Sequence, residues 1–255
     1  MSPLDALLQR AEGLIFDCDG TLVDSLPLYA SAWNAGFAAC GKAMDPAWHA
    51  ARCGLSEALL MDAFEHEHGV TLHREQVSAR MRQHYLAHLD THLREITPIT
   101  AIARRFAGLK PMAVASSGSR AIVTRSLAAL GLAPLLDAVV TLDDTGQAKP
   151  HPAIHLEAAR RLGLPPQRCL VFEDSAQGIE AALRGGLPVV DVLPLIGSGY
   201  KGSTHFSDAP LALSGRTNTA YPMVSNTRKG APNSSVIRNA SVKTVVTSTS
   251  PIRVP

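Results

Sequence analysis

Two aspartates, Asp17 and Asp19, stand two residues apart directly after a short apolar run. Carboxylates held this close repel each other unless a cation or a shared proton lies between them. A carboxylate can attack phosphorus as a nucleophile, and a second one can move the proton that a leaving group needs. The pair therefore suggests phosphoryl transfer, with Asp17 as nucleophile and Asp19 as general acid and base. Taken alone, it could equally be a solvated Asp-x-Asp-Gly turn.

Groups that could hold a phosphate follow two other parts of the chain. Ser116 and Ser117 end a second apolar run, where hydroxyls and turn amides can bind phosphate oxygens. Lys149 comes later, in a Lys-Pro-His-Pro segment whose two prolines stiffen the backbone that presents the ammonium group. Each piece is weak alone, because serines are common in turns and lysines are commonly solvated. Together they predict a phosphate site.

A third apolar run ends in two more acids, Glu173 and Asp174. A hard cation such as Mg²⁺ takes oxygen ligands of this kind. We expect Asp17, Asp19, Glu173 and Asp174 to form the metal site, with Asp19 contributing through its backbone carbonyl. The metal would bring an anionic nucleophile and an anionic substrate together.

The elements that must position these groups can be predicted from the apolar runs. Five runs are continuous rather than alternating, which is typical of buried parallel strands: residues 14–16, 112–115, 138–142, 169–172 and 189–192. Helical stretches separate the later ones, at residues 119–130, 152–162 and 177–184. This alternation predicts a doubly wound, Rossmann-like α/β sheet, which binds ligands at the carboxyl ends of its strands. The candidate residues all follow strands, so they are expected at that edge.

Two segments interrupt the alternation. Residues 25–95 show helical patterns at 28–40, 57–68 and 74–88 without a convincing strand, so we expect an inserted small α-helical cap. The core would then comprise residues 1–24 and 96–196. From residue 197 to 255 the chain is rich in small polar residues and proline and lacks helical periodicity, which predicts an unstructured tail. A valine-rich patch at 242–246 is the weak exception.

The combined motifs resemble those of the haloacid dehalogenase-like hydrolases over residues 13 to about 195. The matching segments are FDCDGT, the serines after the second strand, KPHP and FEDS. The resemblance implies a nucleophilic Asp17, an acid/base Asp19 and an Mg²⁺-binding acidic pair. It also places Gly20, Thr21 and Ser117 in the phosphate site beside Ser116 and Lys149. The second aspartate argues against the dehalogenase branch and for a phosphatase.

The helical insert is similar to the cap of the subgroup that holds sugar phosphatases, phosphoglycolate phosphatases and β-phosphoglucomutases, and the chain looks most like the fructose-1-phosphate phosphatase type. Its segment 52–56 is similar to the cap loop that faces the substrate, which makes Arg52, Gly54 and Ser56 candidates for specificity. A mutase typically carries a histidine where this chain has Tyr29. A sugar phosphatase is therefore the leading interpretation, a mutase the alternative, and a non-catalytic phosphate-binding module the rival from another class.

Composition excludes several other classes. The formal net charge is only +2 over 255 residues, which gives no reason to expect nucleic acid or an anionic membrane as partner. No apolar run approaches the roughly 20 residues needed to cross a bilayer. The four cysteines show no C-x-x-C spacing, and the first residues lack a signal-peptide pattern. We expect a soluble cytoplasmic enzyme acting on a small phosphorylated metabolite.

Three histidines could suggest a different metal site. His84, His88 and His92 recur every fourth residue, so they share one face of the helix predicted there. No carboxylate or thiol spacing supports a transition-metal site, and exposed helix faces are commonly polar. We interpret the three as part of an exposed face.

Overall fold

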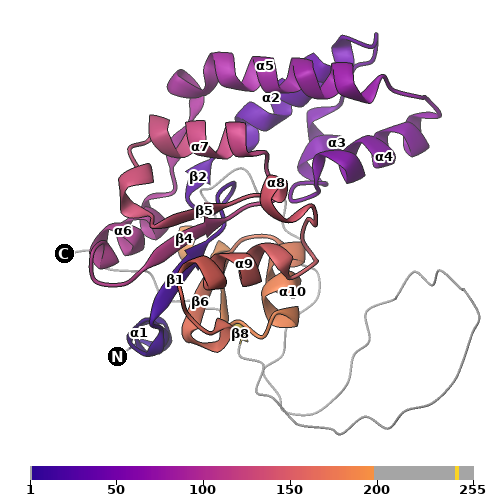
Figure 1. Cartoon of the computed structure of the whole chain (residues 1–255). Helices are drawn as coiled ribbons and strands as arrows, with labels where there is room; N and C mark the ends of the chain where they lie inside the picture. Colours follow the sequence, from indigo (N-terminus) through magenta and orange to yellow (C-terminus); the bar gives the residue numbers. More distant parts are fainter. Residues whose placement is uncertain (1, 198–244, 247–255) are drawn as a thin grey trace, which may run out of the picture. The chain divides into compact units, whose positions relative to one another are not determined.

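A parallel sheet lies at the centre of the computed structural model, which describes residues 2–197 and 245–246 (Figure 1). The strands follow in the spatial order β5 (Ala138–Val140), β4 (Met112–Ala115), β1 (Gly13–Phe16), β6 (Cys169–Glu173), β7 (Val189–Asp191) and β8 (Val245–Val246). Because the chain leaves the central β1 for β4 on one side and later returns to β6 on the other, the order reverses at β1. Ligands bind at such a switch point. The predicted doubly wound fold is confirmed.

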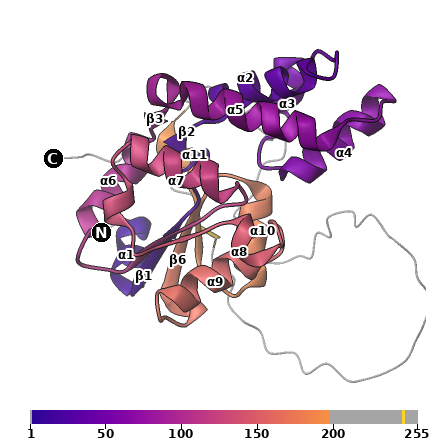
Figure 2. The same cartoon turned by 45° about the horizontal axis from the view of Figure 1, so that its top comes forward.

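Helices cover both faces of this sheet (Figure 2). Side chains alternate along β1: Ile15 packs with α9 (Ala153–Arg161) and α10 (Ala176–Arg184), whereas Leu14 and Phe16 face the opposite way. The opposite face carries α1 (Pro3–Arg10), α6 (Thr97–Phe106) and α7 (Arg120–Ala129), whose apolar residues belong to the same cluster as Leu14 and Phe16. Burial on both faces explains why the strands read as continuous apolar runs.

The insert after β1 is helical, as predicted. It holds α2 (Leu26–Ala38), α3 (Pro46–Ala50), α4 (Glu57–His68) and α5 (Arg74–His92). The rings of Phe37 and Phe64 stack 4.0 Å apart inside it. The expectation that this segment contains no strand was wrong at its end, because β2 (Val23–Asp24) pairs antiparallel with β3 (Arg94–Glu95). This two-residue ladder joins the chain entering the insert to the chain leaving it.

The predicted strand at 138–142 is too long by two residues. Thr141 and Asp144 form a reciprocal capping box that starts the short helix α8 (Leu142–Thr145), so the strand ends at Val140. The remaining elements are α11 (Leu193–Ile196) and two 3₁₀ turns, Ala133–Leu135 and Pro166–Arg168.

The segment predicted as an unstructured tail lies almost wholly outside the described residues. Within it, Val245–Val246 forms β8 and pairs parallel with β7, so the valine-rich patch does supply a strand. Among the helices that the structure describes, none combines the length and apolar character that crossing a membrane requires.

Candidate active site

The loop after β1 is a tight turn organised around Asp17. The Asp17 N–H donates to the Phe172 carbonyl of β6 (2.9 Å), which fixes the start of the turn against the neighbouring strand. Gly20 follows with a φ of 89°, a conformation that favours glycine. A Cβ at Gly20 would lie 2.2 Å from Asp174 Oδ2. Glycine therefore allows the two acidic loops to approach each other.

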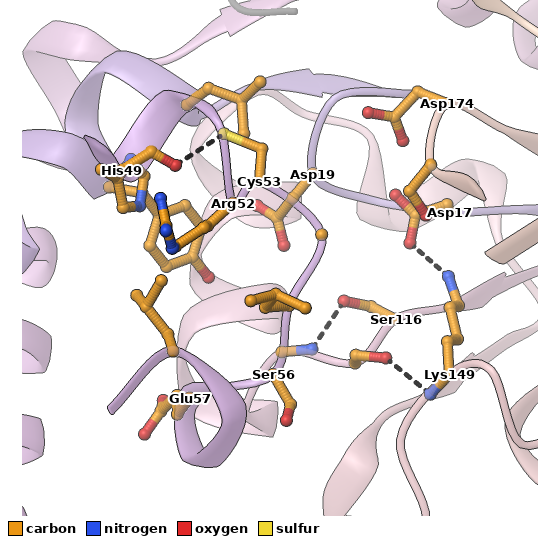
Figure 3. Close-up of a pocket in the computed structure, with 18 of the residues that line it drawn as sticks. Asp17, Asp19, His49, Arg52, Cys53, Ser56, Glu57, Ser116, Lys149 and Asp174 are labelled. Carbon is orange, nitrogen blue, oxygen red and sulfur yellow. Dashed lines mark hydrogen bonds and ion pairs between the residues drawn. The ribbon is translucent and has the colours of Figure 1, made fainter. Parts of the chain in front are cut away.

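Lys149 lies between two buried carboxylates. Its Nζ donates to Asp17 Oδ1 at 2.6 Å (Figure 3) and also to Glu173 Oε1. Burial alone would lower the pKa of Lys149, but the charges of Asp17 and Glu173 outweigh it and raise that pKa. Burial likewise opposes ionisation of Glu173, whereas Lys149 reverses the effect and lowers the pKa of Glu173. The lysine therefore stays charged in the lining of the pocket.

Asp174 completes a group of three acids. Carboxylate oxygens of Asp17, Glu173 and Asp174 all lie within 4.8 Å of one another, and this is the only cluster of potential metal ligands among residues 2–197. Burial, followed by the charge of Glu173, raises the pKa of Asp174 to about 7. Burial also raises the pKa of Asp17 well above its ordinary value. Burial is the main cause of this resistance to ionisation, the neighbouring acids add to it, and a divalent cation would favour the ionised forms.

Asp19 does not join this cluster through its side chain. Its Oδ1 accepts a 2.6 Å hydrogen bond from the Ser25 hydroxyl, and the residue lines the same pocket as Asp17. Burial raises the pKa of Asp19, while the Ser25 hydrogen bond and Lys149 oppose the rise. Ser25 starts α2 but makes no side-chain cap bond, because its hydroxyl is committed to Asp19. A carboxyl group with a raised pKa is suited to exchanging protons.

The serines after β4 lie where the sequence places them. Ser116 Oγ accepts the Gly118 N–H (3.0 Å), and Ser117 Oγ accepts the Lys149 N–H (3.2 Å) (Figure 3). Both hydroxyls act as acceptors, so each keeps its own hydrogen to donate to a ligand. Both line the same pocket as Asp17 and Lys149.

Gly20 and Thr21 have a different environment from these serines. Thr21 is fully buried and its hydroxyl donates to Asp174 Oδ1 at 3.2 Å. Neither residue lines the pocket. Their visible contribution is to place Asp174.

The cap supplies the far wall of the pocket. Arg52, Gly54 and Ser56 all line it, as do His49 and Tyr29. Gly54 has a φ of 90°, and a Cβ there would lie 3.1 Å from the Cβ of Ser175, so the cap loop sits directly against the loop after β6. Ser56 Oγ also accepts the Leu59 N–H at the start of α4. The cap and the core therefore enclose one shared pocket.

Sequence reasoning missed two of these side chains. Ser25 reads as an ordinary first residue of a helix, and no spacing rule links it to Asp19. His49 is a lone histidine in a segment with no recognised motif, and only the folded loop brings it to the pocket. The three histidines at 84, 88 and 92 take no part: the Nδ1 atoms of His88 and His92 bond to backbone carbonyls one turn earlier.

Comparison with known proteins agrees with this geometry. Residues 11–186 match the family model described as haloacid dehalogenase-like hydrolase. The chain is 34% identical to fructose-1-phosphate phosphatase YqaB of Escherichia coli, over 73% of this chain and 98% of that protein. It is 31% identical to hexitol phosphatase A of the same organism, over 72% of this chain and 83% of that one.

A solved structure gives the same fold. The β-phosphoglucomutase of Clostridium difficile superposes with a TM-score of 0.61 at 21% identity, covering 71% of this chain and 84% of that one. The family match extends across Asp17, Ser116, Lys149 and Asp174. The chain belongs to the haloacid dehalogenase-like hydrolases.

Proposed function

We propose that the protein is an Mg²⁺-dependent phosphatase that hydrolyses a small phosphomonoester, a sugar phosphate, through an aspartyl-phosphate on Asp17. The observation that carries the proposal is the convergence of Asp17, Asp19 and Lys149 in one pocket closed by the cap. Binding alone would require neither a nucleophile nor an acid. The named phosphatase relatives support the same reading.

The carboxyl groups and charges of this site fit Mg²⁺. Three clustered carboxyl groups, those of Asp17, Glu173 and Asp174, share a single lysine ammonium, and the pKa values of Asp17 and Asp174 are raised. Asp17 and Asp174 would hold the ion, with Glu173 beside them. When bound, the ion would offset the repulsion between the carboxylates and an incoming phosphate.

The residues then divide the reaction between them. An Asp17 carboxylate oxygen attacks phosphorus and forms a new P–O bond as the bond to the leaving oxygen breaks. Lys149, Ser116 and Ser117 donate to the phosphoryl oxygens. Asp19 gives its proton to the leaving alkoxide, then takes a proton from the water that hydrolyses the aspartyl-phosphate. Inorganic phosphate and free Asp17 are regenerated.

Tyr29 favours hydrolysis over the mutase alternative. It lines the pocket at the position where a mutase typically carries histidine. Burial, followed by the charge of Asp19, raises the pKa of Tyr29 well above its ordinary value. The phenol therefore stays protonated and cannot serve as a base near neutral pH.

The direct test is release of inorganic phosphate from a panel of sugar phosphates, phosphoglycolate and p-nitrophenyl phosphate, with Mg²⁺ and with chelator. We expect release that requires Mg²⁺. Conversion of β-glucose 1-phosphate to glucose 6-phosphate without phosphate release would instead identify a mutase. A lack of turnover with every substrate would refute the proposal.

Removal of Mg²⁺ should affect stability in a pH-dependent way. The pKa of Asp174 rises on folding from 3.8 to about 7, so its contribution to stability is full below 3.8 and is lost as pH rises through about 7. The pKa of Glu173 is lowered, so the stability that its ionisation contributes is lost only at acidic pH. It does not offset the loss caused by Asp174 near pH 7. The metal-free protein should therefore unfold at a lower temperature near pH 8 than near pH 5, and Mg²⁺ should raise Tm more at the higher pH.

Thermal unfolding with and without Mg²⁺ at both pH values checks this, and Asp174→Asn is the control. The variant should show a weaker pH dependence and little response to Mg²⁺. An equal Mg²⁺ response at both pH values would contradict the role given to Asp174.

Ser25→Ala should shift the dependence of kcat/KM on pH. The Ser25 hydroxyl stabilises the ionised form of Asp19, so its loss should raise the pKa of Asp19 further. As general acid in the first step, Asp19 must be protonated, so the basic limb of kcat/KM should move to higher pH. A pH–rate profile on a sugar phosphate measures the shift; movement to lower pH would count against this role.

A further inference from the structure

The cap wall of the pocket carries two charged side chains among the described residues, Arg52 and Glu57. Arg52 is already paired. Its Nη2 donates to Glu67, its Nη1 donates to the Trp48 carbonyl (3.0 Å), and its guanidinium lies 4.2 Å from the Trp48 ring centroid. Glu67 is held in turn by the Trp48 indole N–H (2.8 Å). The guanidinium is thus anchored and neutralised within the cap.

Glu57 is neutralised in the same way. Arg82 of α5 donates to both of its carboxylate oxygens, at 3.3 and 2.8 Å, and the Ser78 hydroxyl adds a contact of 3.3 Å. Among the residues that the structure describes, the cap wall therefore offers no unpaired cation to a second anionic group on a substrate. A phosphate or carboxylate placed there would lose its hydration without gaining a counter-ion, which is unfavourable.

Uncharged polar groups complete the same wall. His49 is only 6% exposed, lines the pocket, and its ring makes no hydrogen bond to any other residue within 2–197. Burial lowers the pKa of His49 to about 4, so the ring is neutral and offers one donor and one acceptor. The Tyr29 hydroxyl also lacks a hydrogen-bond partner in the described part of the chain. Both residues line the pocket, so a substrate hydroxyl bound there could hydrogen-bond to the His49 ring and to the Tyr29 hydroxyl.

We propose that this wall selects an uncharged, hydroxyl-bearing leaving group, bound by His49 and Tyr29, and disfavours substrates that carry a second anionic group. Arg52 and Glu57 shape the wall but stay committed to their own partners. The inference rests on the proposed function, since it names the class of phosphomonoester that the site accepts.

The test compares two matched substrates, a hexitol phosphate and the hexonate phosphate of the same stereochemistry, in which a carboxylate replaces the terminal hydroxymethyl group. We expect kcat/KM to be at least about tenfold higher for the hexitol phosphate, because a buried unpaired charge is costlier than a hydrogen-bonded hydroxyl. p-Nitrophenyl phosphate reports phosphatase activity independently of sugar hydroxyls. If none of the three compounds is hydrolysed, the proposed function fails; if they are hydrolysed but the two hexose derivatives react equally well, only this inference fails.

Variants of His49 test the hydroxyl contact. His49→Leu should lower the ratio of kcat/KM for hexitol phosphate to that for p-nitrophenyl phosphate by about tenfold. His49→Gln, which keeps an uncharged donor and acceptor, should recover part of that ratio. An unchanged ratio in both folded variants would overturn the role of His49.

A second variant tests the neutralised arginine. Glu67→Gln keeps a hydrogen-bond acceptor beside Arg52 but removes the balancing charge, so it should bring the rate on the hexonate phosphate closer to that on the hexitol phosphate. Glu65→Gln is the matched control, because Glu65 lies on the same helix but pairs with Arg74 outside the pocket lining. Unchanged selectivity in Glu67→Gln, or an equal shift in both variants, would contradict the proposal.

Discussion

Asp17→Asn should reduce phosphate release by at least about 10⁴-fold, the scale expected when a covalent nucleophile is removed. The amide offers no carboxylate oxygen to attack phosphorus, although its carbonyl can still accept the hydrogen bond from Lys149. No phosphorylated enzyme should form with any substrate. Phosphate release and intact-protein mass after rapid quenching measure both effects.

The thermal stability of the same variant shows whether activity is lost because the nucleophile is missing or because the protein is unfolded. Because burial raises the pKa of Asp17, a neutral side chain there removes an unfavourable charge. The metal-free variant should therefore unfold at the same temperature as the wild type or a higher one. A folded variant that kept phosphate release within about tenfold of wild type would show that Asp17 is not the nucleophile.

The core of the fold could be predicted because its strands are buried on both faces. Runs such as Leu14 to Phe16 and Met112 to Ala115 are continuously apolar, and each is followed by a polar residue at the sheet edge. Topology then brings distant positions together: Lys149 and Asp17 are 132 residues apart, yet form a 2.6 Å contact. Strand order alone does not give that contact, but the rule for ligand sites in such sheets does.

The parts that escaped prediction depend on contacts between segments. The β2–β3 ladder is only two residues long on each side, too short for any alternation to be visible. The end of β5 was missed because the Thr141 and Asp144 capping box outweighs the apolar run. His49 reaches the pocket only through the packing of the folded cap, and Ser25 meets Asp19 across the turn after β1, so no sequence pattern reveals either contact.

The residues predicted to bind phosphate also have different surroundings in the folded protein. Ser116, Ser117 and Lys149 reach the pocket, whereas Thr21 is turned toward Asp174 and Gly20 makes room for that carboxylate. Neighbours in one sequence motif can thus serve different purposes. Gly20 and Thr21 of the first motif help to place Asp174, whereas Ser116, Ser117 and Lys149 line the pocket.

Asp19→Asn should affect the formation of the aspartyl-phosphate and its hydrolysis differently, depending on the substrate. With a sugar phosphate, the leaving alkoxide needs the proton that Asp19 supplies, so turnover should fall by about 10² to 10⁴-fold. With p-nitrophenyl phosphate the leaving group departs as a stabilised anion, so Asp17 can still be phosphorylated. Water then lacks its general base, and the aspartyl-phosphate should accumulate. We expect a burst of about one nitrophenolate per enzyme followed by slow turnover.

Rapid-quench kinetics and peptide mass mapping can follow this trapped state, with the added phosphoryl group expected on the peptide that contains Asp17. The amide preserves an acceptor for the Ser25 hydroxyl, so the loop should keep its conformation. The double variant Asp17→Asn/Asp19→Asn is the control and should show neither burst nor adduct. If Asp19→Asn lost activity equally on both substrates without a burst, Asp19 would be a structural residue of the turn. A burst confined to the single variant would instead assign the nucleophile and the proton-transfer group in one experiment.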